Sequence, residues 1–177
     1  MNKELKDTLR EERELYIPHI KTLKNRLMAK FTHCEEYQIF QFVHALRSAE
    51  YYGSRNKLLY VFYLRRMNIL GNMLGYFIPA GVLGKGVRLY HLGGIIINLH
   101  SRIGDGCLFH GDNCVGNNGS DNRCPVLGKG VELGVGAKVI GDVVLADGIK
   151  VGANAVVTKS FLEPGITIAG VPAKKIS

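Results

Sequence analysis

Three histidines and one cysteine in the second half of the chain are the side chains best suited to chemistry: His91, His100, His110 and Cys124. A histidine with its ordinary pKa of ~6.5 is largely neutral at pH 7 and can still take a proton, so it can act as a general base. A histidine beside a glycine turn can equally be structural. Cys124 could be a nucleophile, but the sequence shows no paired base for it, and we expect its thiol to pack in a loop.

The composition of the chain limits which cofactors and binding partners are expected. The 177 residues carry a net charge of +8 and four cysteines. The cysteines show neither a CxxC pair nor zinc-site spacing, so we expect reduced thiols and a cytoplasmic protein. No glycine-rich phosphate loop or dinucleotide fingerprint is present. The positive charge suits an anionic small molecule or a membrane surface. Nucleic acid is not an expected partner, because no basic run is interleaved with aromatic residues.

The elements that must position these residues show a six-residue repeat, in which an apolar residue recurs at every sixth position; we call this repeat the beat. A period of six is neither that of a helix nor the simple alternation of a strand, and it is typical of a parallel β-helix, in which short strands and tight turns repeat as a coil. We expect the residues on the beat to point into the coil and the glycines to occupy its corners. The twelve residues on the beat are Leu83, Leu89, Ile95, Ile103, Phe109, Val115, Leu127, Leu133, Val139, Leu145, Val151 and Val157.

The beat is interrupted at two places, where repeat proteins often carry function. A two-residue slip occurs at Ser101-Arg102, and an eleven-residue insertion occupies residues 116–126. The insertion is polar and rich in glycine, which predicts an extended surface loop with a role in binding.

The sequence divides near Ala80 into two regions. Residues 1–80 are rich in helix-forming residues and contain few glycines, which predicts an α-helical N-terminal region of three or more helices. Such an appendage usually caps a solenoid and helps subunits associate. Peripheral membrane contact through residues 58–77 is the alternative. Residues 81–177 form the predicted β-helix, with residues 116–126 as its loop.

The stretch from Ile78 to Ile176 resembles the hexapeptide-repeat acyltransferases, in particular their serine acetyltransferase-like branch. The matching text is GKGVRLYHLGGIIIN at residues 84–98, VGANAVV at residues 151–157 and AGVPAK at residues 169–174. The two-residue slip and the looped-out insertion also stand where that family has them. The wording around His91 looks most like members that serve surface-polysaccharide biosynthesis.

The resemblance implies a fold, an assembly and a reaction. The fold would be an all-β left-handed parallel β-helix with an α-helical N-terminal region; the six-residue period alone does not give its hand. The assembly would be a homotrimer, or a dimer of trimers joined through the N-terminal helices, with acetyl-CoA bound between neighbouring coils. His91 would be the general base that takes a proton from an acceptor hydroxyl as the oxygen attacks the thioester, with no covalent acyl-enzyme and no metal.

The departures from the family concern the acceptor. Serine acetyltransferases have a carboxylate directly before the base and another some fifteen residues upstream, where this chain has Tyr90 and Tyr76. A second histidine of that family is Cys124 here. A serine ammonium group would want a carboxylate partner, whereas tyrosines can hydrogen-bond or pack against a sugar. We therefore expect Tyr76, Tyr90, Cys124 and His110 to line the acceptor site and the acceptor to contain a sugar.

The family also indicates the acetyl-CoA contacts and the alternatives. The expected contacts are Val135, Lys150, Ala153 and Lys174, with the two lysines facing phosphates. The predicted function is acetyl-CoA-dependent O-acetylation of a hydroxyl on a small sugar-containing acceptor. One alternative is serine O-acetylation for cysteine biosynthesis. The other is a zinc protein of the carbonic anhydrase-like β-helix type, in which the three histidines of the second half would bind the metal.

Overall fold

The chain forms two compact units, residues 1–76 and 77–177. The structure is a computed structural model that describes residues 3–120 and 122–177. The first unit is helical and the second is built of short strands. The division falls four residues before the predicted boundary. Helix α4 ends at Leu74 because Gly75 follows it in the left-handed conformation, at φ 76°, which stops a helix.

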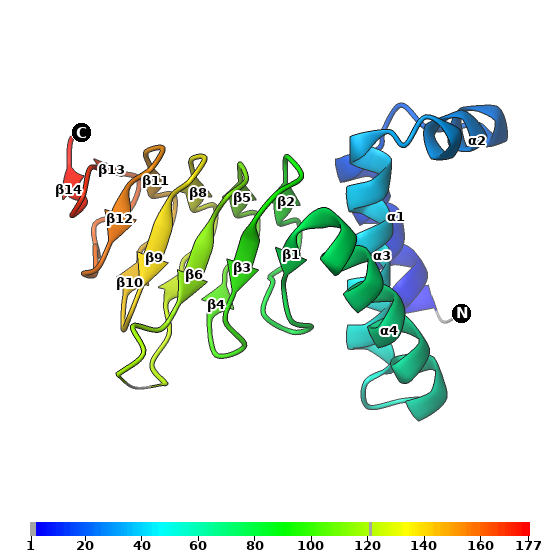
Figure 1. The fold of residues 1–177 in the computed structure, drawn as a ribbon, viewed down its shortest axis with the longest axis horizontal. Helices are drawn as coiled ribbons and strands as arrows, with labels where there is room; N and C mark the ends of the chain where they lie inside the picture. Colours follow the sequence, from blue (N-terminus) through cyan, green and yellow to red (C-terminus); the bar gives the residue numbers. More distant parts are fainter. Residues whose placement is uncertain (1–2, 121) are drawn as a thin grey trace. The chain divides into compact units, whose positions relative to one another are not determined.

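Four helices make up the described part of the first unit (Figure 1): α1 (Lys3–Tyr16), α2 (Leu23–Phe31), α3 (Glu35–Tyr52) and α4 (Lys57–Leu74). Thr22 begins α2 and Asn56 begins α4, and the side-chain oxygen of each accepts a hydrogen bond from a backbone N–H of the first turn. Pro18 lies between α1 and α2, as its missing N–H predicts. Among the residues described, no helix is long and apolar enough to cross a membrane.

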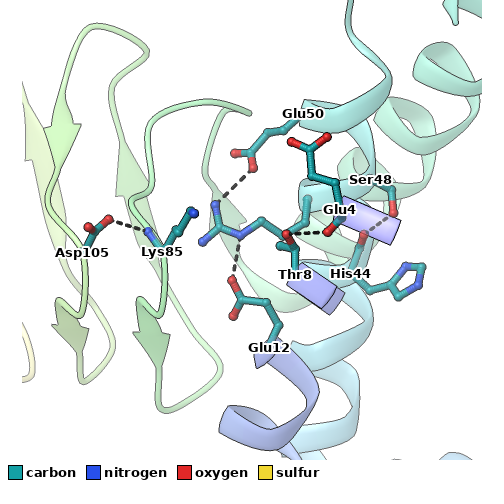
Figure 2. A network of polar contacts seen from close by, with 9 residues as sticks. Glu4, Thr8, Glu12, His44, Ser48, Glu50, Lys85 and Asp105 are labelled. Atoms are coloured by element: carbon teal, nitrogen blue, oxygen red, sulfur yellow. Dashed lines mark hydrogen bonds and ion pairs between the residues drawn. The ribbon is translucent and has the colours of Figure 1, made fainter. Parts of the chain in front are cut away.

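A buried ion pair joins α1 to α3 inside this unit (Figure 2). Arg47 Nε donates to Glu12 Oε1 at 2.8 Å, and Arg47 Nη1 donates to Glu50 Oε2 at 3.1 Å. Burial raises the pKa of Glu12, although Arg47 opposes that rise. Glu12 Oε2 is buried and has no hydrogen-bond partner among the described residues, which agrees with a carboxyl group that is costly to ionise.

The second unit is a coil of three strands per turn, and its strands stack into three sheets (Figure 1). All neighbouring strands with a described register run parallel except β13 and β14, which are antiparallel. The first sheet contains β1 (Tyr76–Phe77), β3 (Ile95–Ile97), β6 (Cys114–Gly116), β9 (Lys138–Ile140) and β12 (Val156–Val157). The second contains β4 (Arg102–Ile103), β7 (Val126–Leu127) and β10 (Val144–Leu145). The third contains β2 (Arg88–Leu89), β5 (Leu108–Phe109), β8 (Glu132–Leu133), β11 (Lys150–Val151), β13 (Thr167–Ala169) and β14 (Lys174–Lys175).

The six-residue beat produces the core of this coil. All twelve residues on the beat are buried, which confirms the prediction that they point inward. Three beats make one coil, so Glu132 of β8 pairs with Lys150 of β11, eighteen positions later. Stacking the coils covers each row of apolar side chains with the next row, and that burial holds the unit together.

The two interruptions of the beat are visible in the strand register. Leu89 pairs with Phe109, twenty positions later, so the slip adds two residues to one coil. Phe109 pairs with Leu133, twenty-four positions later, so the insertion adds a net six. The predicted loop of residues 116–126 is one residue too long at each end, because Gly116 completes β6 and Val126 begins β7. Asp121 of this loop lies outside the described residues.

Candidate functional site

At one corner of the coil, residues that were predicted to have separate roles lie one above another on successive coils. His91 follows β2, and the register places Gly111, Val135 and Ala153 at the same corner of the next three coils. A Cβ added to Gly111 would lie 3.7 Å from His91 Cβ. The Gly136 N–H donates to the Gly111 carbonyl at 3.0 Å, and the Asn154 N–H donates to the Val135 carbonyl at 2.8 Å. The predicted base and two predicted acetyl-CoA contacts therefore share one edge of the molecule.

A buried asparagine fixes the shape of this corner. Asn113 is only 1% exposed. Its Oδ1 accepts from the Gly111 N–H at 3.1 Å, and its Nδ2 donates to the carbonyls of Gly134 at 2.8 Å and Ala137 at 3.3 Å. Gly111 has a φ of 109°, a conformation that L side chains rarely adopt. Asn113 therefore ties the coil that faces His91 to the coil that carries Val135.

Beside the corner, planar side chains are stacked in a short column. The rings of Tyr90 and His110 lie 4.6 Å apart and nearly parallel, at 2°. The Arg88 guanidinium lies over the Tyr90 ring, at 4.8 Å from its centroid. His110 Nε2 and Glu132 Oε1 are hydrogen-bonded at 2.9 Å. Arginine, tyrosine, histidine and glutamate thus follow one another on the third sheet, with the histidine held in place from two sides.

His91 lies at the surface, next to this column. Its side chain is exposed, and its ring centroid is 6.5 Å from that of Tyr90. A single chain thus presents His91 on an open edge. Glu132 is bound to His110 in the neighbouring column, and the exposed Asp112, the residue after Gly111, pairs with Lys138 at 3.7 Å. A base, hydrogen-bonding groups and negative charge on one edge can hold a hydroxyl-bearing molecule and remove its proton.

The loop after β6 folds back on the coil. Arg123 Nη1 donates to Asp142 Oδ2 at 2.7 Å, which joins the loop to the turn before β10. Cys124 is buried, as expected for a thiol that packs in the loop. Its predicted role at the acceptor site stays a prediction, as do those of Tyr90 and His110.

Tyr76 has a different environment. Its ring is only 5% exposed and packs edge-on against Phe42, at 5.3 Å between ring centroids. Burial raises the pKa of Tyr76, and the nearby Glu35 acts in the same direction. This packing belongs to the helical unit, so the structure gives Tyr76 a structural role. Its predicted contact with an acceptor stays a prediction.

The two predicted phosphate contacts are surface lysines of the third sheet. Lys150 is exposed on β11, between Glu132 and Thr167 of the neighbouring strands. Lys174 is exposed on β14 and pairs with Ala169. Ala169 itself lies against Gly152, the residue before Ala153. Both lysines therefore lie on the half of the coil that follows the loop.

Of the three histidines of the zinc alternative, His91 and His100 follow different strands of one turn of the coil, and His110 follows β5 on the next turn. His100 is exposed, and its backbone N–H donates to Asn98 Oδ1 at 3.0 Å. Within the described part of the chain, no three His, Cys, Asp or Glu side chains are placed so that they could hold a metal ion.

Sequence reasoning missed Glu132 and Asn113. Glu132 reaches His110 because the loop adds a net six residues, which keeps the strands in phase. Counting the six-residue repeats across the loop would have predicted that the two residues lie on adjacent strands. The sequence contains only a weak indication that Asn113 matters. It is a polar residue at a position where the equivalent residues of the later coils are Ala137 and Ala155.

Comparison with known proteins places the chain among serine acetyltransferases. No protein-family model matches the sequence. The serine acetyltransferase of Helicobacter pylori strain 26695 is 34% identical over 139 residues, which cover 76% of this chain and 81% of that protein. The enzyme of Buchnera aphidicola subsp. Schizaphis graminum is 36% identical over 107 residues, or 55% of this chain, but the match spans only 38% of the Buchnera protein.

Solved structures agree on the fold. Serine acetyltransferase of Brucella abortus S19 in complex with coenzyme A matches with a TM-score of 0.73 and 22% identity, covering 99% of this chain and 69% of that one. Soybean serine acetyltransferase complexed with serine matches with a TM-score of 0.76 and 23% identity, covering 99% and 70%. The predicted fold, a left-handed parallel β-helix with N-terminal helices, is thereby confirmed. The Helicobacter match extends over most of both proteins, and this chain belongs to the serine acetyltransferase family of hexapeptide-repeat transferases.

Proposed function

We propose that the chain is an acetyl-CoA-dependent O-acetyltransferase that works at the corner occupied by His91. The proposal rests on one observation: His91, Val135 and Ala153 occupy the same corner of the coil. A candidate base and an extended edge of backbone therefore lie along one line. Membership of the family and the coenzyme A complex of the Brucella protein support it.

The chemistry is a direct transfer of the acetyl group. His91 takes the proton of the acceptor hydroxyl as its oxygen attacks the thioester carbonyl carbon. The tetrahedral intermediate collapses, the carbon–sulfur bond breaks, and the proton passes from His91 to the departing CoA thiolate. The products are an O-acetyl ester and CoA, and the histidine returns to its starting state. No covalent acyl-enzyme is needed, because the acceptor oxygen attacks the thioester directly.

L-Serine is the acceptor that the relatives favour, in preference to the sugar expected from the sequence. Their names carry this activity, and the soybean structure contains serine. No carboxylate stands directly before His91 in the sequence, but the proposed site still contains one. Glu132, 2.9 Å from His110, provides the negative charge that a serine ammonium group needs. Arg88, whose guanidinium lies over the Tyr90 ring, suits the serine carboxylate.

Acetyl-CoA is proposed to lie along the same edge, towards the C-terminal coils. Val135 and Ala153 expose their side chains there and would pack against the pantetheine arm. Lys150 and Lys174 would meet the phosphates as point charges.

The assembly is proposed to be a trimer in the cytoplasm. His91 is exposed in a single chain, so a neighbouring coil is needed to enclose the reacting groups and exclude water. The four cysteines are free thiols, which agrees with a reducing compartment. A dimer of trimers joined through the N-terminal helices stays a prediction.

A sugar-containing acceptor, as in surface-polysaccharide biosynthesis, is the second candidate. The observation in its favour is Tyr90, whose ring forms part of the column between Arg88 and His110. Aromatic rings of this kind can pack against a pyranose, whereas serine has no comparable apolar face.

Release of the CoA thiol from acetyl-CoA separates the two acceptors. The purified protein is assayed with L-serine and, in parallel, with a panel of sugars and nucleotide-sugars. Turnover with serine at least tenfold above that with every sugar is the result we expect. Turnover with one sugar and none with serine would transfer the proposal to the second candidate. Absence of CoA release with all of them would contradict the proposed reaction.

A further inference from the structure

The helical unit contains an open cavity of about 610 Å³, built from two helix faces that look towards each other. Lys6, Leu9, Arg10 and Arg13 line it from one face of α1, at the three- and four-residue spacing of a helix. Tyr37, Phe40, Gln41 and His44 line it at the same spacing from α3, and Arg26 joins them from α2. The volume is typical of a site for a small organic ligand.

The charges in this cavity are almost all positive. Lys6, Arg10, Arg13 and Arg26 face a single carboxylate of the lining, Glu14. Arg10 also pairs with Asp7 at 3.1 Å, and Arg13 Nη2 donates to the Ile20 carbonyl at 2.7 Å, so part of each guanidinium is held in place.

This arrangement of cations costs helix stability. Lys6 and Arg10 are four residues apart on α1, and like charges at that spacing destabilise an isolated helix. An anion in the cavity would relieve the repulsion, because arginine binds a phosphoryl group through paired hydrogen bonds.

Apolar and aromatic side chains from both helices complete the lining of the cavity. Leu9, Ile17 and Phe40 form buried parts of the lining. The rings of Phe40 and His44 meet edge-on, at 6.0 Å between centroids. Such a surface suits the hydrocarbon or aromatic part of a ligand, and it would contribute nothing to binding a bare inorganic ion.

His44 completes the part of the lining that α3 provides, and its ring is partly buried. Its Nδ1 is buried and has no hydrogen-bond partner among the described residues, which is costly for a polar atom. Burial, and then the charge of Arg66, lowers the pKa of His44, so the ring is neutral at pH 7. In Figure 2 the His44 ring points away from the Glu12 carboxylate, so the buried ion pair does not satisfy it.

We propose that this cavity binds an organic phosphate, with the phosphoryl group on Arg10, Arg13 and Arg26 and the apolar body against Leu9 and Phe40. The proposal concerns the helical unit alone and does not depend on the acetyl transfer at His91.

Phenyl phosphate is the probe, because it joins one phosphoryl group to one ring. The chain has no tryptophan, so the Tyr37→Trp variant carries a single fluorescent reporter in the wall of the cavity. We expect saturable quenching at millimolar concentration or below, and binding at least about tenfold tighter than that of inorganic phosphate. Saturation-transfer NMR on the wild-type protein checks that the reporter has not created the site.

Matched charge variants locate the binding. Arg10→Gln and Arg26→Gln should each weaken phenyl phosphate about tenfold, the scale of one charge-assisted hydrogen bond. Arg55→Gln is the control, because Arg55 is an exposed arginine of the same unit that pairs with Glu4. His91→Ala should bind the probe as the wild type does.

Three results would overturn the proposal. One is the absence of saturable binding up to about 20 mM. The second is equal affinity for phenyl phosphate and inorganic phosphate, which would show charge attraction without the apolar contact. The third is equal weakening by Arg55→Gln, which would show that the net charge of the unit attracts the anion without a site.

Discussion

At the scale of single residues, the site depends on which groups stand beside His91. Histidines were the obvious candidates in the sequence because few side chains can take a proton near neutrality. Their partners were not obvious. Glu132 lies twenty-two positions after His110, and only the paired strands β5 and β8 bring the two together. The partner of a catalytic side chain on a coil depends on the exact length of each turn, so one loop decides it.

Replacing Glu132 by glutamine tests its proposed role in holding the serine ammonium group. Glutamine keeps the size of the side chain and can still accept a hydrogen bond from His110, but it removes the negative charge. We expect the KM for L-serine to rise about ten- to a hundredfold, the value of one charge-assisted contact, and the KM for acetyl-CoA to stay the same. Steady-state kinetics with each substrate varied in turn measure both.

The control for this change is Glu163→Gln. Glu163 is an exposed carboxylate that pairs with Lys175 at 2.8 Å, near the end of the coil. It should leave both constants unchanged. An unaltered KM for serine in Glu132→Gln would show that the ammonium group is bound elsewhere.

At the scale of secondary-structure elements, the coil was predictable from the sequence, whereas the hydrogen bonds that shape the corner beside His91 were not. Each apolar residue on the beat has the same environment one coil later, so the period alone indicates the fold and the inward face. The corner depends on Asn113, which accepts one hydrogen bond from Gly111 on its own coil and donates two to Gly134 and Ala137 on the next coil. Composition predicted three or more helices, and the described part of the first unit has four. The pairing of Arg47 with Glu12 was not predictable, because thirty-five positions separate the two residues.

Asn113→Ala should loosen the corner. The change leaves the Gly111 N–H without its partner, and an unsatisfied buried group costs about 1–3 kcal/mol. The carbonyls of Gly134 and Ala137 lose the Asn113 amide but keep the backbone N–H groups of Ala137 and Cys114. We expect a lower melting temperature together with a lower kcat, because Gly111 packs against His91. Calorimetry and kinetics on the same preparation measure the two effects. Asn25→Ala, on the exposed surface of α2, is the control and should change neither. A stable but slower Asn113→Ala enzyme would separate positioning from folding.

Arg47→Gln should destabilise the helical unit. It leaves the Glu12 carboxylate buried without its cation, at a cost of about 3–5 kcal/mol, whereas the exposed pair of Arg55 and Glu4 is worth at most about 1 kcal/mol. Urea unfolding followed by the helical signal at 222 nm compares Arg47→Gln with Arg55→Gln. Equal losses in the two variants would contradict a structural role for the buried pair.

The pH dependence of Arg47→Gln has a definite sign. Burial already raises the pKa of Glu12 in the folded state above its value in the unfolded chain, and loss of Arg47 raises it further. The folded state therefore binds the proton more tightly, and its stability falls as the pH rises through the raised pKa. The loss relative to wild type should be smallest below about pH 4.5, where Glu12 is protonated in both states, and should grow as the pH rises.

At the scale of the whole molecule, one chain supplies the base but leaves it open. The cavity of about 610 Å³ is lined by residues of the helical unit and by none of the corner residues. An enzyme that excludes water from a thioester needs a cover over this edge, and the proposed trimer provides a neighbouring coil. Sequence periodicity indicates the coil but contains no information on how many coils assemble, because the surface residues that meet a neighbour follow no fixed period.

The mass in solution tests this assembly. One chain is 19.5 kDa, so light scattering coupled to size exclusion should give three times that mass, or a multiple of three. We expect specific activity to fall on dilution wherever the measured mass falls towards that of one chain, because the open edge is then uncovered. A fully active single chain would contradict the proposed trimer.

The central claim is that His91 removes the proton of the acceptor hydroxyl during transfer from acetyl-CoA. The most direct measurement is the rate of CoA release with L-serine by the wild type and by His91→Ala, with circular dichroism confirming that both are folded. We predict a fall in kcat of about a hundredfold to ten-thousandfold, the usual contribution of a general base, with little change in the KM for acetyl-CoA. A folded His91→Ala enzyme with the wild-type rate would contradict the claim and transfer the role of base to another group at this corner.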